Sequence, residues 1–214
     1  MLFNSVSFLL FCPVVLAGYY ALSLRGQNMW LLVASYFFYG SWDWRFLSLI
    51  LLSTAVDYAV AARLGQTSRP ETRKALLAIS VCTNLGILGF FKYFNFFAES
   101  MAALLAGLGV DVHMSTLNIV LPVGISFYTF QTLSYTIDIY RRRIQPTRDP
   151  LAFALFVAYF PQLVAGPIER ASHLLPRLVR PRRVAWPAMA VGVELILIGY
   201  LKKVALTARA APDR

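Results

Sequence analysis

The sequence predicts an all-α protein that crosses a membrane several times. Of its 214 residues, 58% are hydrophobic and only 14% are charged, whereas about a quarter of the residues of a soluble domain carry a charge. Residues 1–24, 75–91 and 151–168 contain no charged side chain at all. Uncharged apolar runs of this length are typical of membrane spans, and the core of a soluble protein seldom needs them.

The net charge of +10 does not indicate a nucleic-acid partner, because the basic residues lie in short blocks at the ends of apolar runs. These blocks are residues 63–74, 141–148, 170–183 and 202–203. Such placement is typical of cytoplasmic loops and lipid headgroup contacts. The sequence has no zinc-finger spacing and no RNA-binding motif. The lipid bilayer is therefore the expected partner, and nucleic acid is not.

The apolar runs divide the chain into successive spans within one expected membrane domain, residues 1–205. The first run is expected to be a retained helix, because no Lys or Arg precedes it as in a signal peptide. Residues 93–108 allow either an interfacial helix or the end of a long span. The last run is short for a perpendicular span. The expected spans are 5–24, 29–41, 46–62, 75–92, 119–138 and 187–201, followed by a divergent tail, 206–214.

Two loops, residues 63–74 and 141–150, each hold four basic residues and are predicted to be cytoplasmic, which places the N-terminus outside. Residues 169–183 then carry five arginines and one glutamate, a poor composition for an exterior loop. We therefore expect residues 151–168 to form a re-entrant segment that turns near Phe160-Pro161 or Gly166-Pro167. Non-helical backbone at membrane depth requires cover by protein or by a water-filled cavity.

The span at 119–140 is rich in polar side chains, although a helix that only anchored the chain would carry mostly Leu, Val and Ala. Polar groups at membrane depth face other helices, a cavity or water. We interpret this span as a wall of an intramembrane chamber, with plain hydrogen bonding between helices as the alternative. The expected lining residues, two of them from the re-entrant region, are Ser126, Tyr128, Gln131, Ser134, Gln162 and Glu169.

Other candidate site residues are few. Asp57 allows a functional interpretation, or a plain one in which it reaches water or Arg63 near the cytoplasmic end of its span. His113 and His173 have no partner at a useful spacing and are interpreted as ordinary histidines rather than general bases. Cys12 and Cys82 are expected to be small buried apolar residues. No hydrolase elbow, metalloprotease motif, P-loop or dinucleotide fingerprint occurs, and no metal site is expected.

Five stretches of the sequence resemble the membrane-bound O-acyltransferase family, and most of all its alginate O-acetyltransferase branch. The matches follow in order over residues 1–205, and the last two are specific to that branch. They are Met1–Phe8, Ala34–Trp42, Phe90–Phe97, Leu121–Gln131 with Tyr135–Arg141, and Phe160–Arg170.

The resemblance implies a ring of tilted and re-entrant helices around a central funnel. It also implies transfer of an acetyl group from a cytoplasmic thioester such as acetyl-CoA, with no tightly bound cofactor, to hydroxyls of an exported polysaccharide or its O-acetylation partner proteins. The setting would be a bacterial inner membrane. Four arginines could attract the donor phosphates at the cytoplasmic mouth, although topology and lipid contact explain each of them as well. These are Arg141, Arg142, Arg143 and Arg170.

The chain departs from the family in one respect. Relatives are longer, and their catalytic histidine lies in a C-terminal helix, so neither His113 nor His173 inherits that role. We expect an N-terminal fragment that is inactive alone, because the base that would deprotonate the acceptor hydroxyl is missing. The alternative is a non-catalytic or transporter-like membrane module that pairs with another polypeptide.

Overall fold

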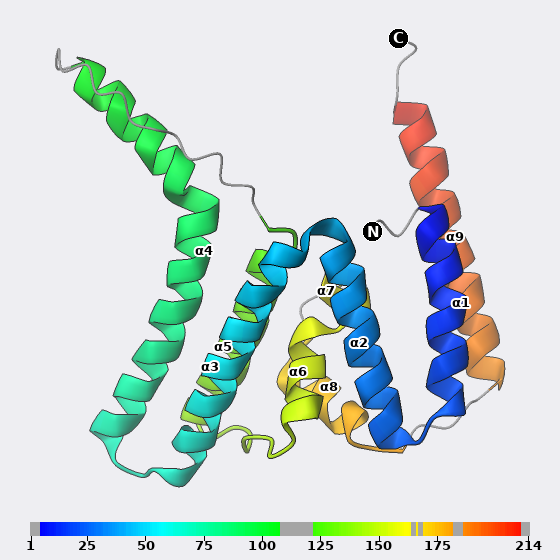
Figure 1. Ribbon diagram of the computed structural model, residues 1–214, viewed down its shortest axis with the longest axis horizontal. Helices are drawn as coiled ribbons and strands as arrows, with labels where there is room; N and C mark the ends of the chain where they lie inside the picture. The colour runs from blue at the N-terminus through cyan, green and yellow to red at the C-terminus, as the bar shows by residue number, and fades with distance from the viewer. Residues whose placement is uncertain (1–4, 108–121, 164–165, 167–168, 182–185, 211–214) are drawn as a thin grey trace. The chain divides into compact units, whose positions relative to one another are not determined.

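The computed structural model describes residues 5–107, 122–163, 166, 169–181 and 186–210. All regular secondary structure in these residues is helical (Figure 1). The chain groups into two compact units, Asn28–Val179 and Met1–Gln27 with Arg180–Arg214. The expectation of one membrane domain over residues 1–205 stays a prediction.

Helix α2 (Leu24–Asp43), from Asn28 onward, and helix α3 (Leu47–Gln66) form a helical hairpin in the larger unit. The chain reverses at a 3₁₀ turn, Trp44–Phe46 (Figure 1), where the Asp43 carboxylate accepts a hydrogen bond from the backbone N–H of Arg45. Each helix has 20 residues, a length of about 30 Å, which matches the hydrocarbon core of a bilayer. By length and composition, the stretch Leu24–Gln66 is apolar enough to cross a membrane, and so is α4.

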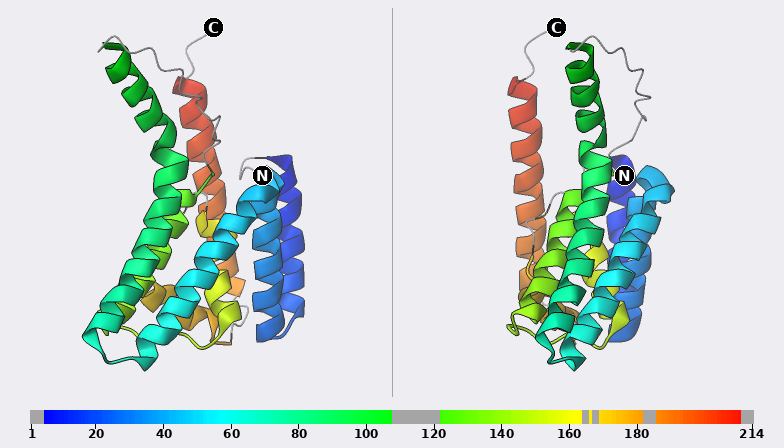
Figure 2. Two further views of the ribbon diagram at one scale, coloured as in Figure 1. Left: turned by 60° about the vertical axis from the view of Figure 1, so that its left-hand side comes forward. Right: turned by 90° about the vertical axis from the view of Figure 1, so that its left-hand side faces the viewer.

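Helix α4 (Pro70–Gly107) runs without interruption for 38 residues. Of the two alternatives for residues 93–108, the structure therefore shows the end of one long helix. Its first half packs against α3 and α5, which also pack against each other, and its last turns extend beyond both helices (Figures 1 and 2). These turns expose Phe96, Phe97, Met101 and Leu104.

Helix α5 (Ile125–Tyr140) begins after Gly124, which has a left-handed φ of 77°. A Cβ atom at this glycine would lie 2.5 Å from the carbonyl oxygen of Leu163, so only glycine allows the two segments to approach this closely. Of the predicted span, residues 119–121 lie outside the described part of the chain.

The predicted re-entrant segment contains a short helix, α6 (Pro150–Ala158), and a single turn, α7 (Phe160–Leu163). The break falls at Tyr159, where ψ is 107°, directly before Phe160-Pro161. Proline at the second position favours the start of a new helical turn, because its missing N–H is not needed there. Helix α8 (Ala171–Leu178) packs against α6 and α5.

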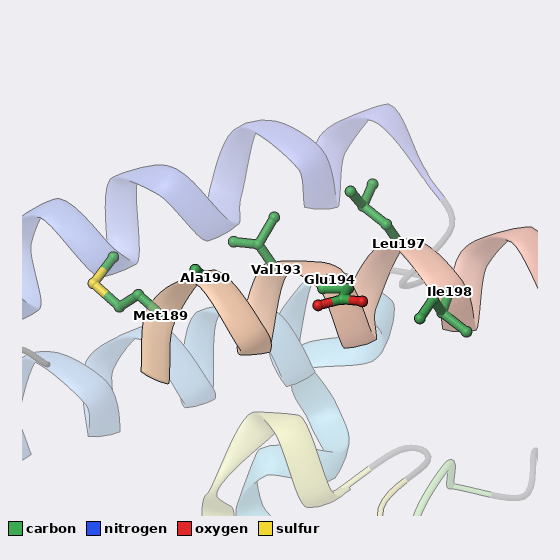
Figure 3. Close-up of a pocket in the computed structure, with 6 residues that line it drawn as sticks. All are labelled: Met189, Ala190, Val193, Glu194, Leu197 and Ile198. Atoms are coloured by element: carbon green, nitrogen blue, oxygen red, sulfur yellow. The ribbon is translucent and has the colours of Figure 1, made fainter. Parts of the chain in front are cut away.

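The smaller unit consists of α1 (Val6–Ala21) and α9 (Trp186–Ala210), together with adjoining residues. Helix α1 starts at Ser5, whose hydroxyl accepts a hydrogen bond from the backbone N–H of Phe8. Between residues 187 and 202, helix α9 exposes several large apolar side chains, among them Val193, Leu195 and Leu197. A shallow depression runs along it, with one acidic residue among its lining residues (Figure 3). That lining consists of Met189, Ala190, Val193, Glu194, Leu197 and Ile198.

Candidate functional site

A network of polar side chains is buried where α3, α4 and α5 meet. At its centre lies Asp57, which is completely buried. Its carboxylate accepts hydrogen bonds from the Ser80 hydroxyl at 2.5 Å and from the Asn84 amide at 2.8 Å. The Asn84 carbonyl oxygen accepts in turn from the hydroxyls of Ser53, at 2.7 Å, and Thr132, at 3.2 Å. The side-chain amide of Asn84 on α4 thereby joins α3, through Asp57 and Ser53, to α5, through Thr132.

The plain interpretation of Asp57 was wrong. The carboxyl group reaches neither bulk water nor Arg63, because it points into the interface between α3 and α4. Among the described residues, no basic side chain forms a salt bridge with it. An unpaired buried carboxyl group is costly, and hydroxyl and amide groups surround it here in place of a cation.

The spacing of polar residues in the sequence indicates this network, although Ser53, Ser80 and Asn84 are not among the candidate residues predicted above. Ser53 and Asp57 are four residues apart, and so are Ser80 and Asn84, which places each pair on one helix face. Two such pairs in neighbouring apolar spans predict a shared polar interface. Asp57 was considered alone, without the pair on the following span.

The break between α6 and α7 has its backbone groups satisfied by two neighbouring helices. The Gln131 amide on α5 donates to the carbonyl oxygen of Phe156 at 2.6 Å. The Ser35 hydroxyl on α2 accepts from the backbone N–H of Phe160 at 3.2 Å and donates to the Leu31 carbonyl oxygen at 2.7 Å. Irregular backbone inside a membrane requires such partners.

Arg73 near the start of α4 is nearly buried and binds the ends of two other helices. Its guanidinium donates to the carbonyl oxygens of Leu64 and Thr67 at the end of α3. It also donates to those of Ile139 and Tyr140 at the end of α5, at 3.1 and 2.9 Å. A cation at helix C-termini satisfies orphan carbonyls and complements the helix dipole. Arg73, which lies in the predicted cytoplasmic loop, therefore joins the start of α4 to the ends of α3 and α5.

The structure separates the predicted chamber-lining residues into two groups. Tyr128, Gln131 and Gln162 are buried between helices. Ser126, Ser134 and Glu169 are partly exposed, and the Ser134 hydroxyl bonds back to the Gln131 carbonyl oxygen of its own helix at 2.8 Å. The buried face of α5 also contains Thr129, Thr132, Tyr135 and Thr136.

Three buried polar residues near the helix break lack hydrogen-bond partners in the described part of the chain. They are Tyr39 and Tyr128, through their phenol oxygens, and Gln162, through both atoms of its amide. The Thr129 hydroxyl shares this property. Buried polar atoms of folded proteins are nearly always paired, so such a group calls for a specific reason.

The four arginines proposed to attract donor phosphates are all exposed. Arg141, Arg142 and Arg143 follow α5, with Arg142 in the left-handed conformation at φ 58°. The N–H groups of Arg142 and Arg143 bond to the carbonyls of Ile139 and Asp138, the pattern of a Schellman motif. Arg170 precedes α8, and no hydrogen bond or ion pair of the described residues joins it to the other three.

A catalytic pair is not evident in the described residues. His173 is exposed on α8, and no hydrogen bond links it to a hydroxyl, thiol or carboxyl group there; His113 lies outside those residues. Cys12 is partly buried, whereas Cys82 is exposed on α4, so the expectation of a buried Cys82 was wrong. No group of metal-ligating side chains occurs within the segments searched. This part of the chain supplies helix interfaces and hydrogen-bonding groups.

Long apolar helices that bury hydroxyl, amide and carboxyl groups between them are typical of membrane proteins with a polar interior. Comparison with known proteins identifies the family. The chain is 39% identical over 214 residues to the probable alginate O-acetylase AlgI of Azotobacter vinelandii, a match over 99% of this chain. It is also 39% identical over 206 residues to the probable alginate O-acetylase AlgI of Pseudomonas aeruginosa, over 95% of this chain.

A third relative, the peptidoglycan O-acetyltransferase of Helicobacter pylori, is 32% identical over 238 residues and matches 96% of the chain. The chain spans 42%, 39% and 44% of the lengths of these three relatives. It belongs to the membrane-bound O-acyltransferase family, in its alginate O-acetyltransferase branch, and corresponds to the N-terminal part of these longer proteins. No family model matches the chain, and no solved structure does.

Proposed function

We propose that this chain is the N-terminal part of a membrane O-acyltransferase that transfers acetyl groups to hydroxyls of an exported polysaccharide or of its partner protein. The observation that carries the proposal is the match to O-acetylases over 95–99% of the chain. The donor is a cytoplasmic thioester such as acetyl-CoA. The setting is a bacterial inner membrane, with the N-terminus outside.

The buried polar network supports this proposal. An acyl transfer inside a membrane needs a polar interior that apolar helices keep in place. The Asp57 network joins α3, α4 and α5, and Gln131 holds α6 beside α5. In this account the chain provides a wall of the reaction chamber, and these hydrogen bonds fix its geometry.

Basic residues at the predicted cytoplasmic side support a role in donor attraction. The exposed Arg141, Arg142 and Arg143 lie next to one another on the loop that directly follows α5. A left-handed Arg142 stabilises the chain less than glycine would at this position. A charged residue at a position that favours glycine is consistent with binding to an anionic group such as a phosphate.

We further propose that the 214-residue chain does not complete the reaction by itself. The reaction requires a base that takes the proton of the acceptor hydroxyl. The described residues offer His173 only as an exposed side chain without a hydrogen-bonded partner. The base then comes from a polypeptide segment corresponding to the remainder of the relatives.

A chimera tests this proposal. The chain replaces the matching part of the Azotobacter vinelandii relative, and the detergent-purified protein, whose two membrane faces are both accessible, receives acetyl-CoA labelled in the acetyl group. We expect label to reach added acceptor polysaccharide with the chimera and with the parent, but not with the 214-residue chain alone. Transfer by the chain alone would contradict its incompleteness, and an inert, correctly inserted chimera would contradict the proposed function.

A further inference from the structure

Three polar residues near the break between α6 and α7 are almost completely buried. The exposed fraction is 2% for Tyr39, 0% for Tyr128 and 6% for Gln162. Their side-chain polar atoms nevertheless have no hydrogen-bond partner in the described residues. Each such group destabilises the folded chain by about 1–3 kcal/mol. Such groups call for a specific reason, and a partner from outside the described residues is one such reason.

Contacts of α7 with α2 and with the start of α5 bring the segments that carry the three residues next to one another. The rings of Phe38 and Phe160 lie 5.4 Å apart, which holds α7 against α2 beside Tyr39. Gly124 lies against the carbonyl group of Leu163, the residue after Gln162. Tyr128 follows Gly124 by one helical turn, and its backbone N–H bonds to the Gly124 carbonyl at 3.1 Å.

The chemistry of these groups defines what they can bind. A carboxamide donates and accepts hydrogen bonds, and so does a phenol. Phe38, Phe160 and Leu163 beside them are apolar, and the buried polar residues nearby, Ser35 and Thr129, are uncharged. A phosphate or carboxylate would therefore be buried there without a counter-ion. The complementary ligand is uncharged and has both a donor and an acceptor.

We propose that Tyr39, Tyr128 and Gln162 form a binding site for an uncharged substrate group that both donates and accepts hydrogen bonds, as a secondary amide or a hydroxyl does. Which substrate supplies this group rests on the proposed function, whose substrates contain two such groups. One is an amide of the pantetheine arm of the thioester donor, and the other is the acceptor hydroxyl. Either would satisfy the orphan amide of Gln162.

Thermal unfolding of the detergent-purified chain tests the site without any need for catalysis. The probes are S-acetylpantetheine, which has amides, methyl glucoside, which has hydroxyls, and S-ethyl thioacetate, which has neither. We expect the first or the second to raise Tm by roughly 3–5 °C at about ten times its Kd, and the third to leave Tm unchanged. The probe that acts identifies the source of the ligand group.

Two variants locate the effect. Gln162→Met removes the amide with little change of shape, and Tyr128→Phe removes one oxygen atom. We expect both to abolish the probe-dependent shift and to keep or raise the Tm of the free chain, because an orphan polar group is lost. The control is Gln145→Met, at an exposed glutamine, which should keep the shift.

Three results would overturn the site: no shift with either polar probe, an undiminished shift in Gln162→Met, or a lower Tm of both free variants. The first would leave an ordered water as the partner of these groups, and the last would show a structural role. Since binding is read directly, an inert chimera in the acetyl-transfer assay would leave this result unaffected.

Discussion

Asp57 shows at the residue scale how a carboxyl group is kept inside an apolar interface. Its two oxygens accept from Ser80 and Asn84 on the neighbouring helix. Removal of the carboxyl group leaves the Ser80 hydroxyl buried without this acceptor, and the Asn84 amide keeps only its bond to the Ser80 carbonyl oxygen. An unsatisfied buried donor costs more than the lost bond itself.

We therefore expect Asp57→Ala to lower the free energy of unfolding by about 2–4 kcal/mol. Asp57→Asn, which keeps one acceptor, should cost clearly less. Chemical denaturation of the detergent-purified chain measures both changes. Glu71→Ala, at an exposed position in the first turn of α4, is the control and should stay within roughly 0.5 kcal/mol. Equal stability of Asp57→Ala and the control would refute the network.

At Arg142, by contrast, we expect a substitution to raise the free energy of unfolding. In the left-handed conformation that it adopts, glycine has no Cβ penalty. Arg142→Gly should raise the free energy of unfolding by about 1 kcal/mol, as measured by the same denaturation. Arg141→Gly, at a neighbouring exposed residue with φ −76°, should not stabilise the chain. A destabilising Arg142→Gly would show that the arginine side chain itself holds the loop.

At the scale of elements, Arg73 joins three helices. Its guanidinium satisfies carbonyl groups at the ends of α3 and α5, and it lies over the Tyr140 ring, with its central carbon 5.6 Å from the ring centroid. Lysine cannot reproduce this fork of donors.

We expect Arg73→Met to lower the free energy of unfolding by roughly 3 kcal/mol, and Arg73→Lys to recover only part of that loss. The adjacent exposed Lys74 provides a matched control, since Lys74→Met changes the net charge equally and should have little effect. If both methionine variants lower the free energy of unfolding equally, the loss comes from the change in net charge, and the hydrogen bonds of Arg73 do not stabilise the fold.

Gln131 joins α5 to α6, because its side-chain amide donates a hydrogen bond to the carbonyl oxygen of Phe156 near the end of α6. Gln131→Leu should therefore lower the free energy of unfolding by about 1–3 kcal/mol and speed proteolysis in the segment after α6. In the chimera it should lower acetyl transfer while the protein still inserts and folds. Normal turnover with faster proteolysis would restrict Gln131 to a packing role.

The helical fold class could be predicted from the uncharged runs. The arginines after residue 168 predicted a turn near Phe160-Pro161 or Gly166-Pro167 without deciding between them, and a helix break lies directly before Phe160-Pro161. The hydrogen-bond partners of the buried polar residues could not be predicted from the sequence, because they depend on which helices pack against each other. Asp57 and Ser80 are 23 positions apart, and Gln131 and Phe156 are 25 apart. Arg73 looked like a loop cation because sequence gives no measure of burial for a residue at a helix start.

At the scale of the whole molecule, we propose that these buried hydrogen bonds hold the N-terminal part of an O-acetyltransferase together. The described residues form long apolar helices, and the relatives of this chain are O-acetylases. If the proposal is right, this chain can replace the matching part of a working relative.

The most direct test is the acetate content of alginate exported by an acetylase-deficient host that carries the chimera. The account predicts restored acetylation, and a loss of at least about tenfold when Asp57→Ala is introduced into the chimera, because the network that fixes the chamber wall is then broken. Unacetylated alginate from cells whose membranes contain the folded chimera would contradict the account.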